Sequence, residues 1–278
     1  MTSDAKNTEM PAAMILCGGK GTRLRDINEV LPKPLVPIGE YPIVWHIMKS
    51  YAAFGVKRFI LCLGYKKEEF VDYFINYHSR TYDVTIDLAR ENNLQIHSTG
   101  SREDWQVTLA NTGLETLTAG RVRIAAKYLN ETDEDFFLTY GDGVSDLNFE
   151  EELKFHRKHG KMLTCLAVKP AARFGEMLIK DNKVINFNEK PAASEGYING
   201  GFMIMKKEFL EKYLNKQENQ ALEQEPMNNA AEDGEMCAYK HQGFWQCMDN
   251  PREYQLLNEL WQNKQAPWTK HWNGSAEL

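Results

Sequence analysis

A glycine-rich segment near the N-terminus has the residue types needed to hold a phosphate chain. Residues 16–23 read LCGGKGTR, and Lys33 follows between two prolines. Three glycines let the backbone approach phosphate oxygens with its N–H groups exposed. The planar guanidinium of Arg23 suits phosphate oxygens, and Lys33 adds a point charge. A glycine loop alone is often only a tight turn, but with Arg23 and Lys33 it predicts a phosphate-binding site.

The spacing of the glycines excludes two common phosphate-binding motifs. The Walker pattern G-x-x-x-x-G-K-[ST] is absent, and residues 18–21, GGKG, lack the G-x-G-x-x-G spacing of dinucleotide-binding folds. The segment instead resembles the signature L-[AC]-G-G-x-G-T-R-L followed by P-K-P. That signature is typical of the sugar-nucleotide pyrophosphorylases, a family of nucleotidyltransferases.

Further segments narrow the resemblance to the glucose-1-phosphate cytidylyltransferase branch of this family. They are residues 42–49 (PIVWHIMK), 139–144 (TYGDGV), 173–175 (RFG), 188–191 (NEKP), 198–202 (INGGF), 222–226 (LEQEP) and 244–249 (FWQCMD). The resemblance implies transfer of a cytidylyl group from CTP to α-D-glucose 1-phosphate, which gives CDP-glucose and pyrophosphate. It also implies a place in deoxysugar or surface polysaccharide biosynthesis, such as that of O-antigen lipopolysaccharide.

The same resemblance assigns roles to individual residues. The catalytic group comprises Arg23, Lys33 and Asp142. The nucleotide contacts comprise Leu16, Gly18, Gly19, Gly21, Thr22, Arg23, Lys33, Thr116, Arg121 and Gly141. The sugar phosphate contacts comprise Glu189, Lys190, Asn199 and Gly200, and the Mg²⁺ ligands are Asp142 and Asp249. Thr116 stands where serine is common, and both retain a hydroxyl. A second departure, residues 39–42 (GEYP) in place of Gly-Gly-Lys-Pro, removes one positive charge.

Some of these residues have plainer interpretations when the resemblance is set aside. Asp142, flanked by glycines after a strand, suits Mg²⁺ beside a triphosphate, but it also suits a solvated turn. The Glu189-Lys190 pair could be an exposed charged turn. Lys20 is expected to point toward water, and Trp45 and His46 are expected in the core or at an interface.

The elements that must position these residues alternate between strand and helix. We expect strands at 12–16, 58–63, 84–88, 135–140, 163–168, 201–205 and 236–239, and a hairpin at 178–185. We expect helices at 42–54, 67–77, 120–128, 149–158, 209–214 and 253–262. Repeated β-α-β order predicts an α/β fold, with a Rossmann-like, mostly parallel mixed sheet between helices. Functional loops then lie at the carboxyl ends of the strands. The resemblance implies the nucleotide-diphospho-sugar transferase fold with a small sugar-binding β/α insertion.

Composition limits the partners and the location. The net charge is −6 without any basic block, so no nucleic-acid partner is expected. No run approaches the roughly 18 apolar residues of a membrane span, and a cytoplasmic protein with five reduced cysteines is expected. Residues 1–12 are expected to be a disordered lead-in to one domain at 13–278, with nucleotide-binding (about 13–169) and sugar-binding (about 170–278) parts. A homo-oligomer is expected from the resemblance, with Trp261, Trp268 and Trp272 as contact anchors or as core residues.

Two alternatives remain open from the sequence. Another sugar 1-phosphate, or UTP or dTTP, could replace the expected substrates, because hydrogen bonds to the base and sugar decide that choice. A nucleotide-binding regulatory subunit without turnover is the second alternative. Such proteins usually lose the arginine, the lysine or a metal carboxylate, and this chain keeps Arg23, Lys33, Asp142 and Asp249.

Overall fold

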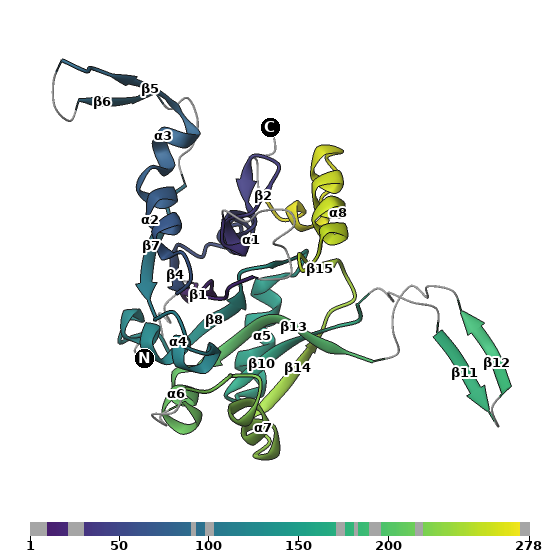
Figure 1. Cartoon of the computed structure of the whole chain (residues 1–278). Helices are drawn as coiled ribbons and strands as arrows, with labels where there is room; N and C mark the ends of the chain where they lie inside the picture. The colour runs from purple at the N-terminus through teal and green to yellow at the C-terminus, as the bar shows by residue number, and fades with distance from the viewer. Residues whose placement is uncertain are drawn as a thin grey trace, which may run out of the picture.

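The structure is a computed structural model, drawn in Figure 1. It describes residues 10–21, 31–89, 93–97, 103–170, 176–180, 183–188, 196–214 and 219–272. The packed chain begins before residue 13, contrary to the predicted boundary. Pro11 and Ala12 are buried, and the carbonyl of Ala12 accepts a hydrogen bond from Phe137 N. This pairing with a neighbouring strand orders the end of the expected lead-in.

A seven-stranded sheet forms the centre of the molecule, in the order β14-β10-β13-β8-β1-β4-β7. Its strands are β1 (Ala13–Leu16), β4 (Arg58–Leu63), β7 (Gln106–Asn111), β8 (Asp135–Tyr140), β10 (Leu163–Val168), β13 (Ile198–Lys206) and β14 (Met236–Lys240). Neighbouring strands are parallel except at β13, which is antiparallel to β8 and to β10. The chain reaches β13 after a hairpin instead of a crossover helix, and parallel pairing requires a crossover. The predicted mostly parallel mixed sheet is confirmed.

Helices cover both faces of this sheet, as the buried strands require. Side chains alternate along β1, so that Ala13 and Ile15 join one buried cluster while Met14 and Leu16 join the other. The first cluster includes residues of α1 (Ile43–Ala52), α2 (Lys67–Ile75), α5 (Phe149–His159) and α8 (Pro251–Gln262). The second includes residues of α4 (Thr118–Ala125), α6 (Lys207–Tyr213) and α7 (Glu225–Glu232).

Local sequence sets the ends of two covering helices. Asn148 caps α5 by accepting a hydrogen bond from Glu151 N at 3.0 Å, and Gly160, with a φ of 70°, ends it. Asn250 caps α8 in the same way, with Pro251 in its first turn. These polar and glycine signals explain why both helices lie within a few residues of their predicted bounds.

Several elements differ from the sequence-based expectations. The helix expected at 67–77 is two helices, α2 and α3 (Tyr77–Thr81). The helix expected at 120–128 begins two residues earlier as α4 and ends as the 3-10 helix η3 (Ala126–Tyr128). The strands β6 (Leu94–His97) and β7 and the helix α7 were not anticipated. Of these, β7 pairs with β4, which lies far earlier in the chain, whereas β6 pairs with the nearby β5 (Asp83–Ile86).

Two hairpins project from the body in Figure 1. One is formed by β5 and β6. The other is formed by β11 (Glu176–Lys180) and β12 (Lys183–Asn188) and confirms the hairpin predicted at 178–185. Shorter elements complete the chain, namely η2 (Lys33–Leu35), β2 (Pro37–Ile38), β3 (Tyr41–Pro42), β9 (Gly143–Ser145), β15 (Trp245–Cys247) and η4 (Pro267–Thr269). Strands from both sides of residue 170 join the central sheet, so the two expected parts share one core.

The C-terminal tryptophans close this core. Trp268 is 1% exposed, and its indole Nε1 donates to Nδ1 of His46 at 3.2 Å. His46 Nε2 lies 2.9 Å from the carbonyl oxygen of Ile38, and burial lowers the pKa of His46 to about 4. Trp261 packs edge-on against the same imidazole, and Trp272 packs on the cluster. Trp45 and His46 are therefore core residues, as expected.

The five cysteines are free thiols. Within the described ranges, no helix is both long enough and apolar enough to cross a lipid bilayer.

Candidate active site

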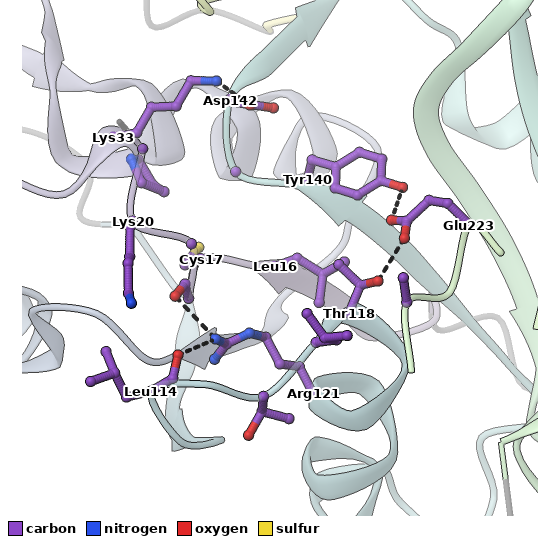
Figure 2. A pocket seen from close by; sticks show the side chains of 18 of the residues that line it. Leu16, Cys17, Lys20, Lys33, Leu114, Thr118, Arg121, Tyr140, Asp142 and Glu223 are labelled. Atoms are coloured by element: carbon purple, nitrogen blue, oxygen red, sulfur yellow. Dashed lines mark hydrogen bonds and ion pairs between the residues drawn. The ribbon is translucent and has the colours of Figure 1, made fainter. Parts of the chain in front are cut away.

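A cleft of about 560 Å³ opens at the carboxyl ends of β1 and β8. Figure 2 shows side chains from several distant segments turned toward it. The lining comprises residues 16–21, Lys33, Pro34, residues 114–118, Arg121, residues 140–142, Ala221, Glu223 and Asp249. The cleft therefore lies where parallel α/β sheets generally bind ligands.

The glycine loop is shaped by two close contacts. A Cβ atom on Gly18 would lie 2.0 Å from the guanidinium of Arg121, so this position requires glycine. Gly21 has a φ of 57°, and a Cβ there would lie 2.9 Å from Cβ of Lys33. The loop thus packs directly on both basic residues. Two predicted nucleotide contacts, Thr22 and Arg23, lie outside the described residues.

Lys33 joins two carboxylates from opposite ends of the sequence. Its Nζ contacts Asp142 Oδ2 at 2.5 Å and also Asp249 Oδ1. Burial alone would lower the pKa of Lys33, but the charges of Asp142 and Asp249 and hydrogen bonds to them outweigh it and raise that pKa above its usual value. The ammonium group therefore stays charged at neutral pH.

The backbone explains how Asp249 reaches Asp142. The antiparallel pair β9–β15 sets Gly143 opposite Cys247, and Met248 N donates to the carbonyl of Asp142 at 2.8 Å. The carboxylate of Glu253 accepts a hydrogen bond from Asp249 N at 2.6 Å. The predicted metal ligands are thus brought together by strand pairing.

Two carboxylates that share one cation have the chemistry of a magnesium site. Mg²⁺ is held by one or two carboxylates together with waters and phosphate oxygens, rather than by a cage of protein ligands. Among the described residues there is no cluster of three or more His, Cys, Asp or Glu side chains that could hold a metal. Asp142 and Asp249 therefore fit a shared ion of this kind, whereas a zinc cage finds no ligand set in the described chain.

Arg121 links the glycine loop to the loop that follows β7. Arg121 is 5% exposed, and its guanidinium donates to the carbonyls of Gly18 at 3.1 Å and Leu114 at 3.2 Å. It also donates to Gly113 O and Thr112 Oγ1, both at 2.8 Å. These bonds give Arg121 a positioning role beneath the cleft. Its predicted contact with the nucleotide stays a prediction.

The two sides of the cleft mouth meet at an ion pair. Lys20 Nζ contacts Glu115 Oε1 at 2.9 Å, with the Lys20 side chain 48% exposed. Thr116 and Gly141 also line the cleft, and their predicted contacts with the nucleotide stay predictions. The expectation that Lys20 points only into water misses its pairing with Glu115.

The predicted sugar phosphate contacts are only partly visible. Glu189 and Lys190 lie outside the described residues. Asn199 and Gly200 begin β13 and do not line the cleft directly. The next residue, Gly201, packs against Tyr140, which does line it, because a Cβ on Gly201 would lie 2.5 Å from the Tyr140 ring.

Glu223, Tyr140 and Thr118 line the cleft and are among the residues that received no individual role from the sequence. Glu223 accepts hydrogen bonds from Tyr140 OH at 2.5 Å and from Thr118 Oγ1 at 2.7 Å. Figure 2 shows this group across the cleft from Lys20 and Leu114. Glu223 and Tyr140 lie within segments that carry the family resemblance, but nothing in their spacing indicates that they meet.

Comparisons with known proteins find relatives that align over nearly the whole chain. The nucleotidyl transferase family model matches residues 12–260. The chain is 44% identical over 260 residues to the glucose-1-phosphate cytidylyltransferase of Salmonella typhimurium, covering 94% of this chain and 99% of that protein. It is 40% identical over 256 residues to the probable glucose-1-phosphate cytidylyltransferase of Bacillus subtilis, covering 92% and 98%.

A solved structure supports the fold. The crystal structure of HddC from Yersinia pseudotuberculosis matches 91% of this chain and 100% of its own, with a TM-score of 0.64 at 22% identity. The predicted nucleotide-diphospho-sugar transferase fold is confirmed. Sequence and structure together show that this chain belongs to the nucleotidyl transferase family.

Proposed function

We propose that this chain transfers a cytidylyl group from CTP to α-D-glucose 1-phosphate, giving CDP-glucose and pyrophosphate. The observation that carries the proposal is the meeting of the glycine loop, Lys33, Asp142 and Asp249 in one cleft. The choice of nucleotide and sugar is supported by the names of the two relatives, which align over nearly their whole length.

In the proposed reaction an oxygen of the sugar 1-phosphate attacks the α-phosphorus of CTP, and the bond from that phosphorus to the pyrophosphate oxygen breaks. The attacking phosphate is already ionised, so a general base and a covalent nucleophile are unnecessary. Such transfers depend on positioning and on neutralisation of charge. Lys33 supplies a permanent positive charge. We expect Arg23 to add a second charge and Lys190 to anchor the attacking phosphate.

Magnesium is the proposed cofactor, with Asp142 and Asp249 as its ligands. Both residues offer hard oxygen donors to a single cation position, and the triphosphate would supply further oxygens. When bound, the ion would neutralise phosphate charge and polarise the reacting phosphorus.

We further propose a cytoplasmic homo-oligomer that serves surface polysaccharide or deoxysugar synthesis. Trp261 and Trp268 are buried in the core, which leaves little of either for a subunit contact. Exposed apolar side chains instead gather on α2 and on the β5–β6 hairpin with its connection, namely Ile75, Ile86, Leu88 and Leu94. Light scattering coupled to size-exclusion chromatography tests the assembly, and a monomer at micromolar concentration would contradict it.

A substrate matrix tests the reaction directly. Pyrophosphate release is measured with Mg²⁺ for CTP, UTP, dTTP, ATP and GTP against several hexose 1-phosphates, and the products are identified by mass spectrometry. We expect CTP with glucose 1-phosphate to give the highest kcat/KM. A higher value for UTP or dTTP, or for another sugar, would replace the proposed substrates. Nucleotide binding without pyrophosphate release from any pair would instead indicate a regulatory subunit.

A further inference from the structure

Among the residues that the structure describes, Glu223 has no cationic partner, although it lines a cleft built for anions. Among the described residues, Asp142 and Asp249 are paired with Lys33, and Glu115 is paired with Lys20. Glu223 contacts only neutral groups in that part of the chain. A carboxylate in this position repels phosphate, so this corner of the cleft suits a neutral group that donates hydrogen bonds.

The position of Glu223 is fixed by two hydroxyls. Burial and the adjacent Glu223 raise the pKa of Tyr140, so its phenol stays protonated and donates to Oε1. Thr118 donates to Oε2 and accepts from Leu222 N at 2.7 Å, which leaves its hydroxyl proton directed at Glu223. Each carboxylate oxygen has further lone pairs for a ligand. The carboxylate is thus pre-organised as an acceptor, at little entropic cost on binding.

Neighbouring contacts indicate which part of a substrate lies here. The ring of Tyr140 packs on Gly201 of β13, next to Asn199 and Gly200, the expected sugar contacts. The opposite wall carries Lys20 and the loop at 114–116, where the nucleotide is expected (Figure 2). Lys33, which carries a positive charge in the cleft, forms its ion pair with Asp142 and not with Glu223. The hydroxyl groups of a sugar ring are the neutral donors that match this position.

We propose that Glu223, held by Tyr140 and Thr118, accepts hydrogen bonds from hydroxyl groups of the sugar 1-phosphate and thereby selects an uncharged hexose. This inference rests on the proposed transfer reaction. It predicts that sugars carrying a second phosphate or a carboxylate near these hydroxyls are rejected, because their charge would lie against Glu223.

The test combines variants with a series of deoxy sugars. KM and kcat are measured for CTP and for glucose 1-phosphate and its 2-, 3-, 4- and 6-deoxy analogues, with wild type, Glu223→Gln and Glu223→Ala. Glu232→Gln, on an exposed part of α7, is the matched control. Circular dichroism and thermal melting establish that each variant is folded.

We expect Glu223→Ala to raise KM for glucose 1-phosphate about 10- to 100-fold while KM for CTP changes less than about twofold. Wild type should discriminate against at least one deoxy analogue by a similar factor, and Glu223→Ala should lose that discrimination. Glu223→Gln should show a smaller effect, since its amide oxygen still accepts. Glu232→Gln should match wild type.

Two outcomes would overturn the inference. One is a rise in KM for CTP instead of the sugar, which would place a base or ribose donor at Glu223. The other is a wild-type enzyme that accepts every deoxy analogue equally, a result that does not depend on any variant folding. If wild type releases no pyrophosphate, the proposed reaction fails. Calorimetric binding of glucose 1-phosphate to wild type and Glu223→Gln then still decides the role of Glu223.

Discussion

Carboxyl groups in the cleft lie beside a positively charged side chain, whereas a carboxyl group in the core beneath α5 does not. In the cleft, Asp142 and Asp249 share the ammonium group of Lys33. On α5, Glu152 is fully buried, neither of its oxygens has a hydrogen-bond partner among the residues that the structure describes, and burial raises its pKa to about 8. The comparison shows that a carboxyl group buried without a counter-charge or a hydrogen-bond donor stays protonated at neutral pH, whereas Asp142 and Asp249 face the charged ammonium group of Lys33.

Neutralising one carboxylate of the cleft should have the largest effect on the activity. We expect Asp142→Asn to lower kcat about 10²- to 10³-fold, because a preorganised charge at the phosphates is lost. Initial rates at saturating substrates measure the change. Glu232→Gln, which removes an exposed carboxylate of α7 that does not line the cleft, is the control and should retain most activity. Near wild-type turnover of Asp142→Asn would contradict the proposed site.

A double-mutant cycle asks whether Lys33 and Asp142 act as one unit. We expect Lys33→Met to lower kcat about 10²-fold or more, and the double variant to lose little beyond the worse single variant. The reason is that each residue positions the other through their direct contact. Fully multiplicative losses in kcat would show that the two residues act independently.

The pH dependence of the free energy of unfolding tests whether Glu152 is protonated in the folded protein. Glu152 has a folded pKa above its unfolded value, so the folded state binds more protons. The stability from this group is therefore present at low pH and is lost as pH rises from about 4.5 to about 8. We expect the contribution of Glu152 to the free energy of unfolding to fall by about 3 kcal/mol between pH 5 and pH 8.

Urea unfolding of wild type and Glu152→Gln across this range isolates the contribution. Glutamine is close in shape and cannot ionise, so the variant should gain stability relative to wild type as pH rises. An unchanged difference in unfolding free energy at pH 5 and pH 8 would mean that Glu152 is not held protonated.

Arg121 differs from both the paired carboxylates of the cleft and the buried Glu152. It is a buried charged group whose hydrogen bonds go to neutral acceptors. We expect Arg121→Met to lower the free energy of unfolding by about 2 kcal/mol, since the carbonyls of Gly18, Gly113 and Leu114 lose their donor. KM for the nucleotide should rise as the glycine loop loosens. Denaturant unfolding and steady-state kinetics measure both. A stable variant with normal KM would refute the positioning role.

Much of the fold follows from local patterns. The apolar runs of β1, β4 and β8 and the capped ends of α5 and α8 are encoded within a few residues, so their positions are predictable. The pairing of β7 with β4 joins segments far apart in the chain, and no local pattern indicates it.

The sequence by itself determined the chemistry of the site: a glycine loop, Lys33 between prolines, and an aspartate after a buried strand. Only the tertiary structure decided which groups share a space. The β9–β15 pairing brings Asp249 to Asp142, and the segment at 219–223 docks on α4, where Ala119 N donates to the carbonyl of Gln220. That docking places Glu223 against Tyr140 and Thr118. Residue type is a local property, whereas proximity between residues far apart in the chain arises only when the sheet assembles.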